Sequence, residues 1–168
     1  TNGFVCQPLC RKKMYTNKKW IFTTITIIWT AVIFGFSMQP ADVSNDISMS
    51  FLTEVFAKLV PGILENEAVA DFIHLLVRKG AHFTEYAILG VLSAIAVKEY
   101  VVKYKVLLNL FFCFAIACMD ETLQRFVPGR EGRFFDVMID TCGAILGIAI
   151  VWIIVNKIRK SEKIIKKI

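Results

Sequence analysis

The sequence lacks the short motifs that identify many enzymes and metalloproteins. It contains no P-loop, no nucleophile elbow and no H-E-x-x-H string. Its five cysteines have neither a zinc-binding spacing nor the pattern of a disulfide framework. It also shows no internal repeat, which argues against a transporter that works as a monomer. The interpretation therefore depends on how apolar and charged residues are distributed along the chain.

Charged residues are scarce, at 20% of the chain, and they leave long apolar segments between them. Hydrophobic residues make up 56% of the chain and its mean hydropathy is +0.58, which is more apolar than an ordinary soluble domain. The first apolar segment has 19 residues without a charge, enough to cross a hydrocarbon layer of about 30 Å. We predict an all-α integral membrane bundle of four transmembrane helices, over Trp20–Met38, Ala81–Val97, Val106–Phe126 and Val137–Asn156.

The segment 41–79, between the first two predicted spans, carries too many charges to cross a membrane. Its apolar residues recur at helical spacing on both sides of Pro61 and Gly62. We expect two short amphipathic helices here, lying on the membrane or over a site at its surface; a re-entrant hairpin is the alternative. Residues 1–13 resemble neither a helix nor a signal peptide, and we expect Met14 to be the native start.

Basic residues gather on one side of the predicted bundle. With a cytoplasmic N-terminus, the inner segments hold 14 of the 20 basic residues and two of the 14 acidic ones. Basic enrichment of short loops marks the cytoplasmic side, so we expect both termini there. Basic clusters beside apolar spans suit anionic membrane lipids, and we expect no nucleic-acid partner. The chain then divides into a basic N-terminal tail (1–19), a membrane domain (20–156) and a basic cytoplasmic C-terminal tail (157–168).

Polar residues interrupt the apolar segments at one end of each. His82 and Glu85 open the second span, residues 120–124 close the third, and Asp136 and Asp140 open the fourth. Because consecutive spans run in opposite directions, these positions meet at the same face, which is the outer face in this orientation. Ionisable groups inside a membrane are costly and rarely left unpaired, so a convergent set indicates a functional site.

The side chains of this polar set have complementary chemistry. An imidazole beside a carboxylate can act as a general base near neutral pH. Carboxylates can hold a divalent metal, and arginines pair with phosphate or carboxylate groups of a ligand. A purely structural alternative also stands, in which the acids charge a helix N-terminus and the arginines are solvated. The candidate catalytic residues are His82, Glu85 and Glu121; the candidate binding residues are Lys79, Tyr86, Asp120, Gln124, Arg130, Arg133, Asp136 and Asp140; and the candidate metal ligands are Asp120, Glu121, Asp136 and Asp140.

Three strings in this order resemble the VanZ-like family of bacterial membrane proteins. They are S-M-Q-P at 37–40, KGAHFTEYAILG at 79–90 and DETLQRFVPGREGRFFDVMIDTCGAILG at 120–147. The resemblance implies a polytopic helical protein of the bacterial cell membrane, in a family whose namesake is linked with low-level resistance to the glycopeptide teicoplanin. All the candidate residues above match the family pattern except Arg133, which we add from its chemistry alone.

Two hypotheses remain open from the sequence. In the first, a polar pocket in the outer leaflet binds the head group of a lipid-linked cell-wall precursor or of a lipoglycopeptide, and so contributes to teicoplanin-type resistance. In the second, the protein is a small membrane enzyme, a hydrolase or transferase acting on an envelope lipid, with His82 as its base. Bound metal and the behaviour of His82 variants would separate the two.

Overall fold

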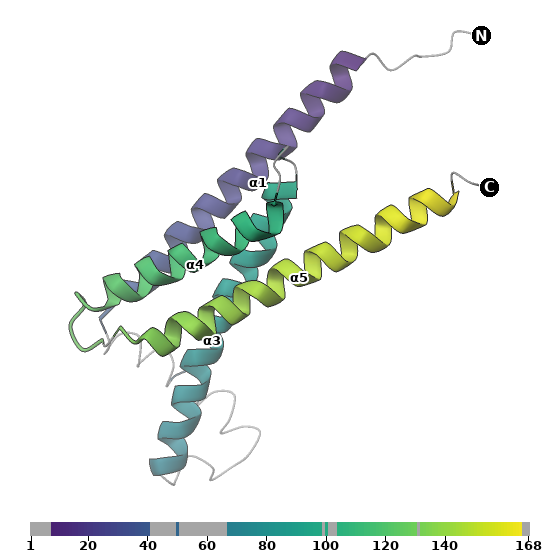
Figure 1. The fold of residues 1–168 in the computed structure, drawn as a ribbon. Coiled ribbons are helices and arrows are strands. Elements are labelled where there is room, and N and C mark those ends of the chain that lie inside the picture. Colours follow the sequence, from purple (N-terminus) through teal and green to yellow (C-terminus); the bar gives the residue numbers. More distant parts are fainter. Residues whose placement is uncertain are drawn as a thin grey trace, which may run out of the picture.

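The computed structural model describes residues 8–40, 50, 67–98, 100, 104–130 and 132–165. Every regular element in these ranges is a helix (Figure 1). Helix α1 covers Pro8–Ser37, α3 covers Glu67–Lys98, α4 covers Lys105–Gln124 and α5 covers Phe134–Ile165. Each of the four is long and apolar enough to cross a membrane, which confirms the predicted all-α membrane bundle.

Helix α3 is longer than the predicted second span. It has 32 residues, or about 48 Å at 1.5 Å per residue, and begins at Glu67 instead of Ala81. The second of the two expected short amphipathic helices is therefore the first half of α3 and not a separate element. The reason is that Gly80 alone does not break a helix, because its cost is only about 1 kcal/mol. The first expected short helix and the alternative hairpin lie outside the described residues.

Helices α1 and α5 are also longer than the predicted spans. Helix α1 begins at Pro8, so the expectation that residues 1–13 are not helical is wrong from Pro8 onward. Helix α5 continues through most of the basic C-terminal tail, as far as Ile165. Lysine and arginine are good helix formers, so these basic tails extend the helices instead of ending them.

The start of α1 and the end of α5 lie at one end of the bundle (Figure 1). Helices α3 and α5 point in the same direction and form the most extensive interface. Helix α4 packs on both, and α1 packs on α3 and α4. The end of α1, the end of α4 and the start of α5 lie at the opposite end, beside the middle of α3 (Figure 1). The polar strings found in the sequence therefore come together at this second end, which we call the polar end.

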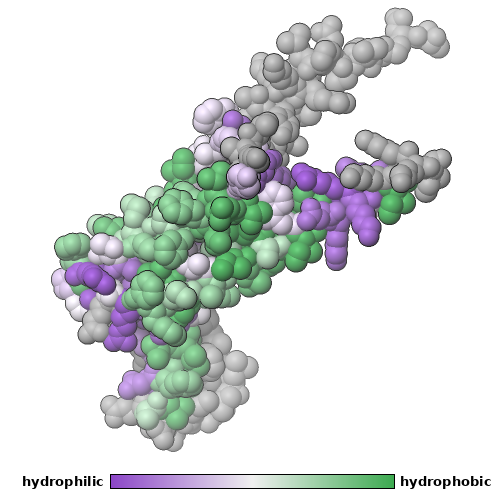
Figure 2. Space-filling view, in the orientation of Figure 1, coloured by the Kyte–Doolittle hydropathy of each residue, from purple (hydrophilic) through white to green (hydrophobic). Residues whose placement is uncertain are grey.

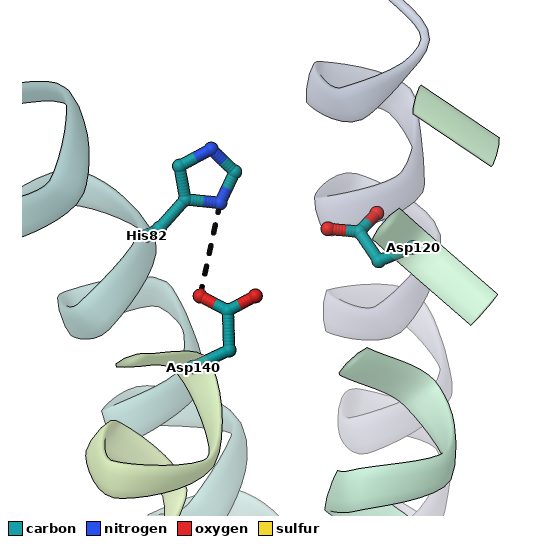
Figure 3. Close-up of side chains that lie close together, drawn as sticks. All are labelled: His82, Asp120 and Asp140. Carbon is teal, nitrogen blue, oxygen red and sulfur yellow. Dashed lines mark ion pairs between the residues drawn. The ribbon is translucent and has the colours of Figure 1, made fainter. Parts of the chain in front are cut away.

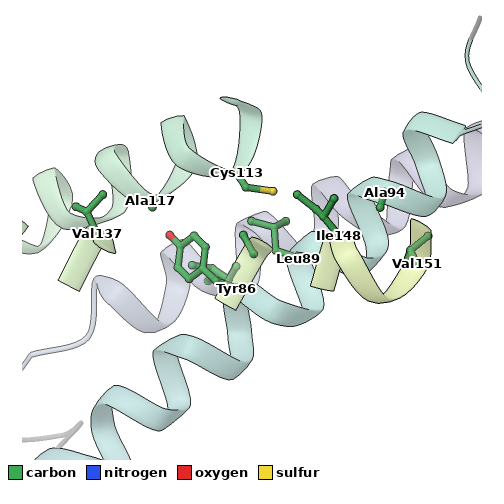
Figure 4. Close-up of a cluster of buried hydrophobic side chains, with 10 residues drawn as sticks. Tyr86, Leu89, Ala94, Cys113, Ala117, Val137, Ile148 and Val151 are labelled. Atoms are coloured by element: carbon green, nitrogen blue, oxygen red, sulfur yellow. The ribbon is translucent and has the colours of Figure 1, made fainter. Parts of the chain in front are cut away.

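The interior of the bundle contains a small apolar cluster (Figure 4). Tyr86 and Leu89 of α3, Cys113 of α4 and Ile148 of α5 are buried in it. Many larger apolar side chains point outward instead, such as Phe111 of α4, which is 69% exposed. They form an apolar band between two hydrophilic ends of the molecule (Figure 2). An exposed apolar surface of this extent is the surface that a bilayer covers.

Contacts at the end where α1 begins and α5 ends hold α1 against the connection between α3 and α4. The hydroxyl groups of Thr23 and Tyr100 share a hydrogen bond of 2.8 Å, and the Lys19 ammonium lies 3.9 Å from the centroid of the Tyr100 ring. The Lys105 ammonium donates to the Lys98 carbonyl oxygen at 2.8 Å. These contacts fix this end of the bundle.

Candidate functional site

Small residues bring α3 and α5 into backbone contact just inside the polar end. A Cβ atom added to Gly143 would lie 2.2 Å from the Phe83 carbonyl oxygen, and one added to Gly147 would lie 2.1 Å from the Ala87 carbonyl oxygen. Gly90 approaches α5 equally closely from the other helix. Glycines permit such close packing of membrane helices. The contact sets the register of α3 and α5, and with it the side chains that face each other one turn away.

Three titratable side chains face one another at this point, and we call them the polar centre (Figure 3). His82 comes from α3, Asp120 from α4 and Asp140 from α5. One nitrogen or oxygen atom of each lies within 4.8 Å of the others, and His82 Nδ1 is 3.9 Å from Asp140 Oδ1. Both aspartate residues are fully buried, at 0% exposure. The three groups are therefore placed to share a proton or a cation.

Within the described part of the chain, several buried polar atoms of the polar centre have no hydrogen-bond partner. His82 Nδ1, Asp120 Oδ1 and both carboxylate oxygens of Asp140 are buried and have no hydrogen-bond partner there. The 3.9 Å between His82 and Asp140 is too long for a hydrogen bond. Buried polar atoms are nearly always paired, and leaving them unpaired is costly. Such a group of atoms is typical of a site built for a ligand.

Two further hydroxyl groups lie beside the Asp120 carboxylate, from Tyr86 of α3 and Ser37 of α1. Ser37 is the last residue of α1 and is 1% exposed, so all four helices contribute to the surroundings of Asp120. Ser37 was not among the residues predicted to form the site. The sequence did carry a signal for it, because Ser37 begins the S-M-Q-P string.

An ion pair lies one turn above the polar centre, toward the polar end. The Lys79 ammonium donates to Asp136 Oδ1, which links α3 to the first turn of α5. The same ammonium lies 5.6 Å from the centroid of the Phe135 ring. Both charged side chains are about a quarter exposed, so they form an accessible edge above the buried groups.

The end of α4 and the following loop are held together through Glu121. The Gln124 side-chain amide donates to Glu121 Oε1 at 3.3 Å, and the Arg133 backbone N–H donates to Glu121 Oε2 at 3.0 Å. Gly132 packs against the Glu121 carbonyl oxygen so closely that an added Cβ would lie 2.2 Å from it. Glu121, which the sequence favoured as a catalytic residue, thus holds the loop between α4 and α5 in place.

Arg130 and Glu85 lie on the inner side of the same cluster. Burial lowers the pKa of the Arg130 guanidinium from its ordinary value, and Arg78 lowers it further, while the carboxylates of Asp120, Glu121 and Glu85 oppose this shift. Arg130 is only 9% exposed. It therefore supplies buried positive charge beside the carboxylates, as Arg–carboxylate pairing requires.

A cavity of about 250 Å³ opens above the polar centre, and we call it the cleft. Its cationic wall contains Arg78, Lys79 and Arg133, and its floor contains His82 and Asp140. The remaining lining residues are Leu75, Gln124, Gly129, Asp136 and Ile139. Arg78 and the apolar Leu75 and Ile139 were not predicted to belong to the site. The positions of Leu75 and Arg78 depend on α3 beginning well before Gly80, which the sequence analysis did not foresee.

The structure places all the predicted site residues at the polar end, in two layers. One layer lines the cleft, and the other lies beneath or beside it. The residues that line the cleft are Lys79, His82, Gln124, Arg133, Asp136 and Asp140, of which Gln124 and Asp140 are themselves buried; the others are Glu85, Tyr86, Asp120, Glu121 and Arg130, of which Glu85 is half-buried. Of the four carboxylates considered as metal ligands, Asp120 and Asp140 face one another across the polar centre, whereas Glu121 and Asp136 have partners elsewhere.

Four spanning helices that enclose titratable groups at one end define a polytopic membrane protein with a built polar site. The model of the VanZ/LLP1 family matches residues 22–155, and this chain belongs to that family. No curated protein and no solved structure matches the chain.

Proposed function

We propose that this protein acts in the bacterial cell envelope and that its cleft binds the polar head group of an amphiphile at the outer leaflet. The amphiphile is a lipid-linked cell-wall precursor or a lipoglycopeptide of the teicoplanin type. Binding of such a molecule at the membrane surface contributes to resistance against that class of antibiotic. The teicoplanin link comes from the family resemblance, and the cleft supplies the chemistry.

The observation that carries this proposal is the composition of the cleft. Arg78 and Arg133 present guanidinium groups, which suit the phosphate of a lipid-linked precursor or the carboxylate of a glycopeptide. The Lys79 ammonium adds a third positive charge, next to Asp136. A head group in the cleft would thus meet several donors at the boundary of the apolar band.

The apolar side of the cleft suits the lipid tail of the same ligand. Leu75 and Ile139 line the cleft, and Leu75 is 45% exposed. Phe72 and Leu76, on the same half of α3, are 60% and 53% exposed. An acyl chain could leave the cleft along this surface and remain in the bilayer, where apolar contact costs nothing. A head group without a tail would not use this surface.

The runner-up is a membrane enzyme acting on an envelope lipid, and one observation favours it. His82 lies on the floor of the cleft with Asp140 beside it, the arrangement of a general base with a carboxylate. Against it, Glu121 is occupied by the loop, and Glu85 does not line the cleft. Binding alone therefore uses more of the observed geometry than hydrolysis or transfer does.

Equilibrium binding to the purified protein in lipid nanodiscs tests the proposal. Fluorescent teicoplanin and a polyprenyl diphosphate are the two probes, which separate the two sources of the ligand. Arg78→Ala should weaken binding of the true ligand about 10- to 100-fold, the cost of one charge-assisted hydrogen bond. Arg125→Ala is the matched control, because Arg125 is exposed and does not line the cleft.

The outcomes of this experiment are distinct. Equal affinity of the Arg78 and Arg125 variants for both probes would refute the cleft as the binding site. Release of a cleaved product from either probe, lost in His82→Gln, would favour the enzyme. Susceptibility of cells to teicoplanin, measured with the same variants at equal expression, should follow the affinity for whichever probe binds.

A further inference from the structure

The polar centre has the donor set of a metal site, and we propose that His82, Asp120 and Asp140 bind one divalent first-row transition-metal ion, such as Zn²⁺. The ion would lie at the floor of the cleft. The ligand set differs from an oxygen-only set, because one imidazole from α3 joins one carboxylate from α4 and one from α5.

The first argument is that the donor atoms have no other partner. Asp140 offers two buried carboxylate oxygens and Asp120 offers one, and none of the three has a hydrogen-bond partner in the described ranges. His82 Nδ1 is also buried and has no hydrogen-bond partner in those ranges. Two carboxylates at 0% exposure, facing each other inside a membrane helix bundle, need positive charge close by, and the one charge of Arg130 is shared among Asp120, Glu121 and Glu85. A dication supplies it at the point where the free atoms converge.

The second argument is the spacing of the donors. Bonds of about 2.0–2.2 Å from zinc to nitrogen or oxygen, in a tetrahedral arrangement, place two ligand atoms about 3.3–3.6 Å apart. The His82–Asp140 pair, at 3.9 Å, is within a few tenths of an ångström of this separation. The widest pair of the three, within 4.8 Å, has to close by up to about 1.2 Å. Rotation of the side chains can supply this, because the Asp140 carboxylate has no hydrogen-bond partner in the described ranges and the Asp120 carboxylate accepts one long bond, from Gln124 Nε2 at 3.4 Å.

The third argument is selectivity. Imidazole is a favourable ligand for zinc and its neighbours, whereas magnesium and calcium prefer shells of oxygen ligands only. The additional carboxylates that an oxygen-only site would require are engaged: Glu121 accepts from Gln124 and from the loop backbone, and Asp136 pairs with Lys79. The composition of the centre therefore favours a transition metal over a hard cation.

The position of the centre gives the ion a role in the proposed function. His82 and Asp140 line the cleft, whereas Asp120 lies behind them, so the open coordination positions face the cleft. Three protein ligands with an open position are the arrangement of a metal that binds an exchangeable ligand. A phosphate or carboxylate oxygen of the head group would fill that position, with the arginines of the cleft around it. This role, unlike the metal site itself, depends on the proposed function.

The test is metal content of the full chain, purified in detergent without chelators and measured by elemental mass spectrometry, followed by Zn²⁺ titration of the chelator-treated protein. We expect one ion per chain and at least about 10-fold weaker Zn²⁺ binding in His82→Gln, Asp120→Asn and Asp140→Asn, since even indirect supporting groups cost that much. Asp71→Asn and Glu162→Gln are the matched controls, because both acids are exposed and outside the polar centre and the cleft, and they should bind Zn²⁺ as the unaltered protein does.

X-ray absorption at the zinc edge keeps the proposal falsifiable if a variant does not fold. The unaltered protein should show one imidazole among light-atom ligands. Absence of bound metal after supplementation, a shell without imidazole, or equal losses in the control variants would each overturn the proposal. No amphiphile enters these measurements. If no metal is found, the head-group proposal is still tested by binding to the Arg78 variant. If that binding test fails, the metal measurement is unaffected.

Discussion

Replacing Gly143 by alanine should destabilise the protein and open the polar centre. The new Cβ would lie 2.2 Å from the Phe83 carbonyl oxygen, against about 3.4 Å for an ordinary contact, so α3 and α5 must separate by roughly 1 Å. The carbonyl oxygen is a backbone atom and the Cβ position is fixed by the backbone, so no side-chain rotation relieves the contact. Overpacking of this kind costs about 1–3 kcal/mol. Because Phe83 adjoins His82 and Gly143 follows Asp140 by one turn, the same displacement draws the two donors apart.

Gly35→Ala is the control for this substitution. A Cβ at Gly35 meets nothing within 4 Å, so the change there alters only the helix propensity of a glycine in the last turn of α1. The difference between the two variants isolates the packing cost, about a 5- to 150-fold shift in the unfolding equilibrium. Unfolding in mixed micelles, followed by tryptophan fluorescence, measures it. If Gly143→Ala were as stable as Gly35→Ala, the close α3–α5 contact would be wrong.

Three further predictions concern other parts of the bundle. Trp29→Phe should cost about 1 kcal/mol in the same unfolding assay, because the indole N–H donates to the Glu85 carbonyl oxygen at 3.0 Å; no loss would contradict that contact. Gly132→Ala should displace the loop from Glu121 and speed amide exchange at the loop N–H bonded there, whereas unchanged exchange would contradict the packing. A reporter inserted in the loop 125–133 should be active only outside the cytoplasm, and a cytoplasmic signal would reverse our orientation.

The convergence of polar residues at one end could be predicted from the sequence alone. The alternation of apolar spans fixes the end at which each polar string lies, because consecutive spans cross in opposite directions. Asp120 and Asp140 are far apart in sequence, yet this rule places them together. Close packing of the last span against another helix could also be predicted, because Gly143 and Gly147 are four residues apart on one face.

The pairing within the site could not be predicted. Which carboxylate faces His82 depends on the register of α3 against α5, and that register follows from contacts such as Gly143 against Phe83. The sequence therefore left Glu121 and Asp136 as equal candidates for metal binding, whereas each has another partner in the folded chain. A helical period identifies the face of one helix but contains no information about its neighbour.

The start of α3 could not be predicted either. The charges around Lys79 and the glycine after it suggested a helix start, but nothing there removes a backbone hydrogen bond as proline would. The continuous α3 places Arg78 and Leu75 over the centre and so creates the cleft. Local composition alone could not show this, because burial of that half of α3 depends on the rest of the bundle.

A charge exchange between Lys79 and Asp136 tests most directly whether the polar strings of α3 and α5 meet at one site. Lys79→Asp and Asp136→Lys should each lower the melting temperature in nanodiscs, because each places like charges in contact. The double variant restores the opposite charges and should recover most of the loss, with a coupling of about 0.5–3 kcal/mol. A double variant as unstable as the sum of the two single variants would contradict the account.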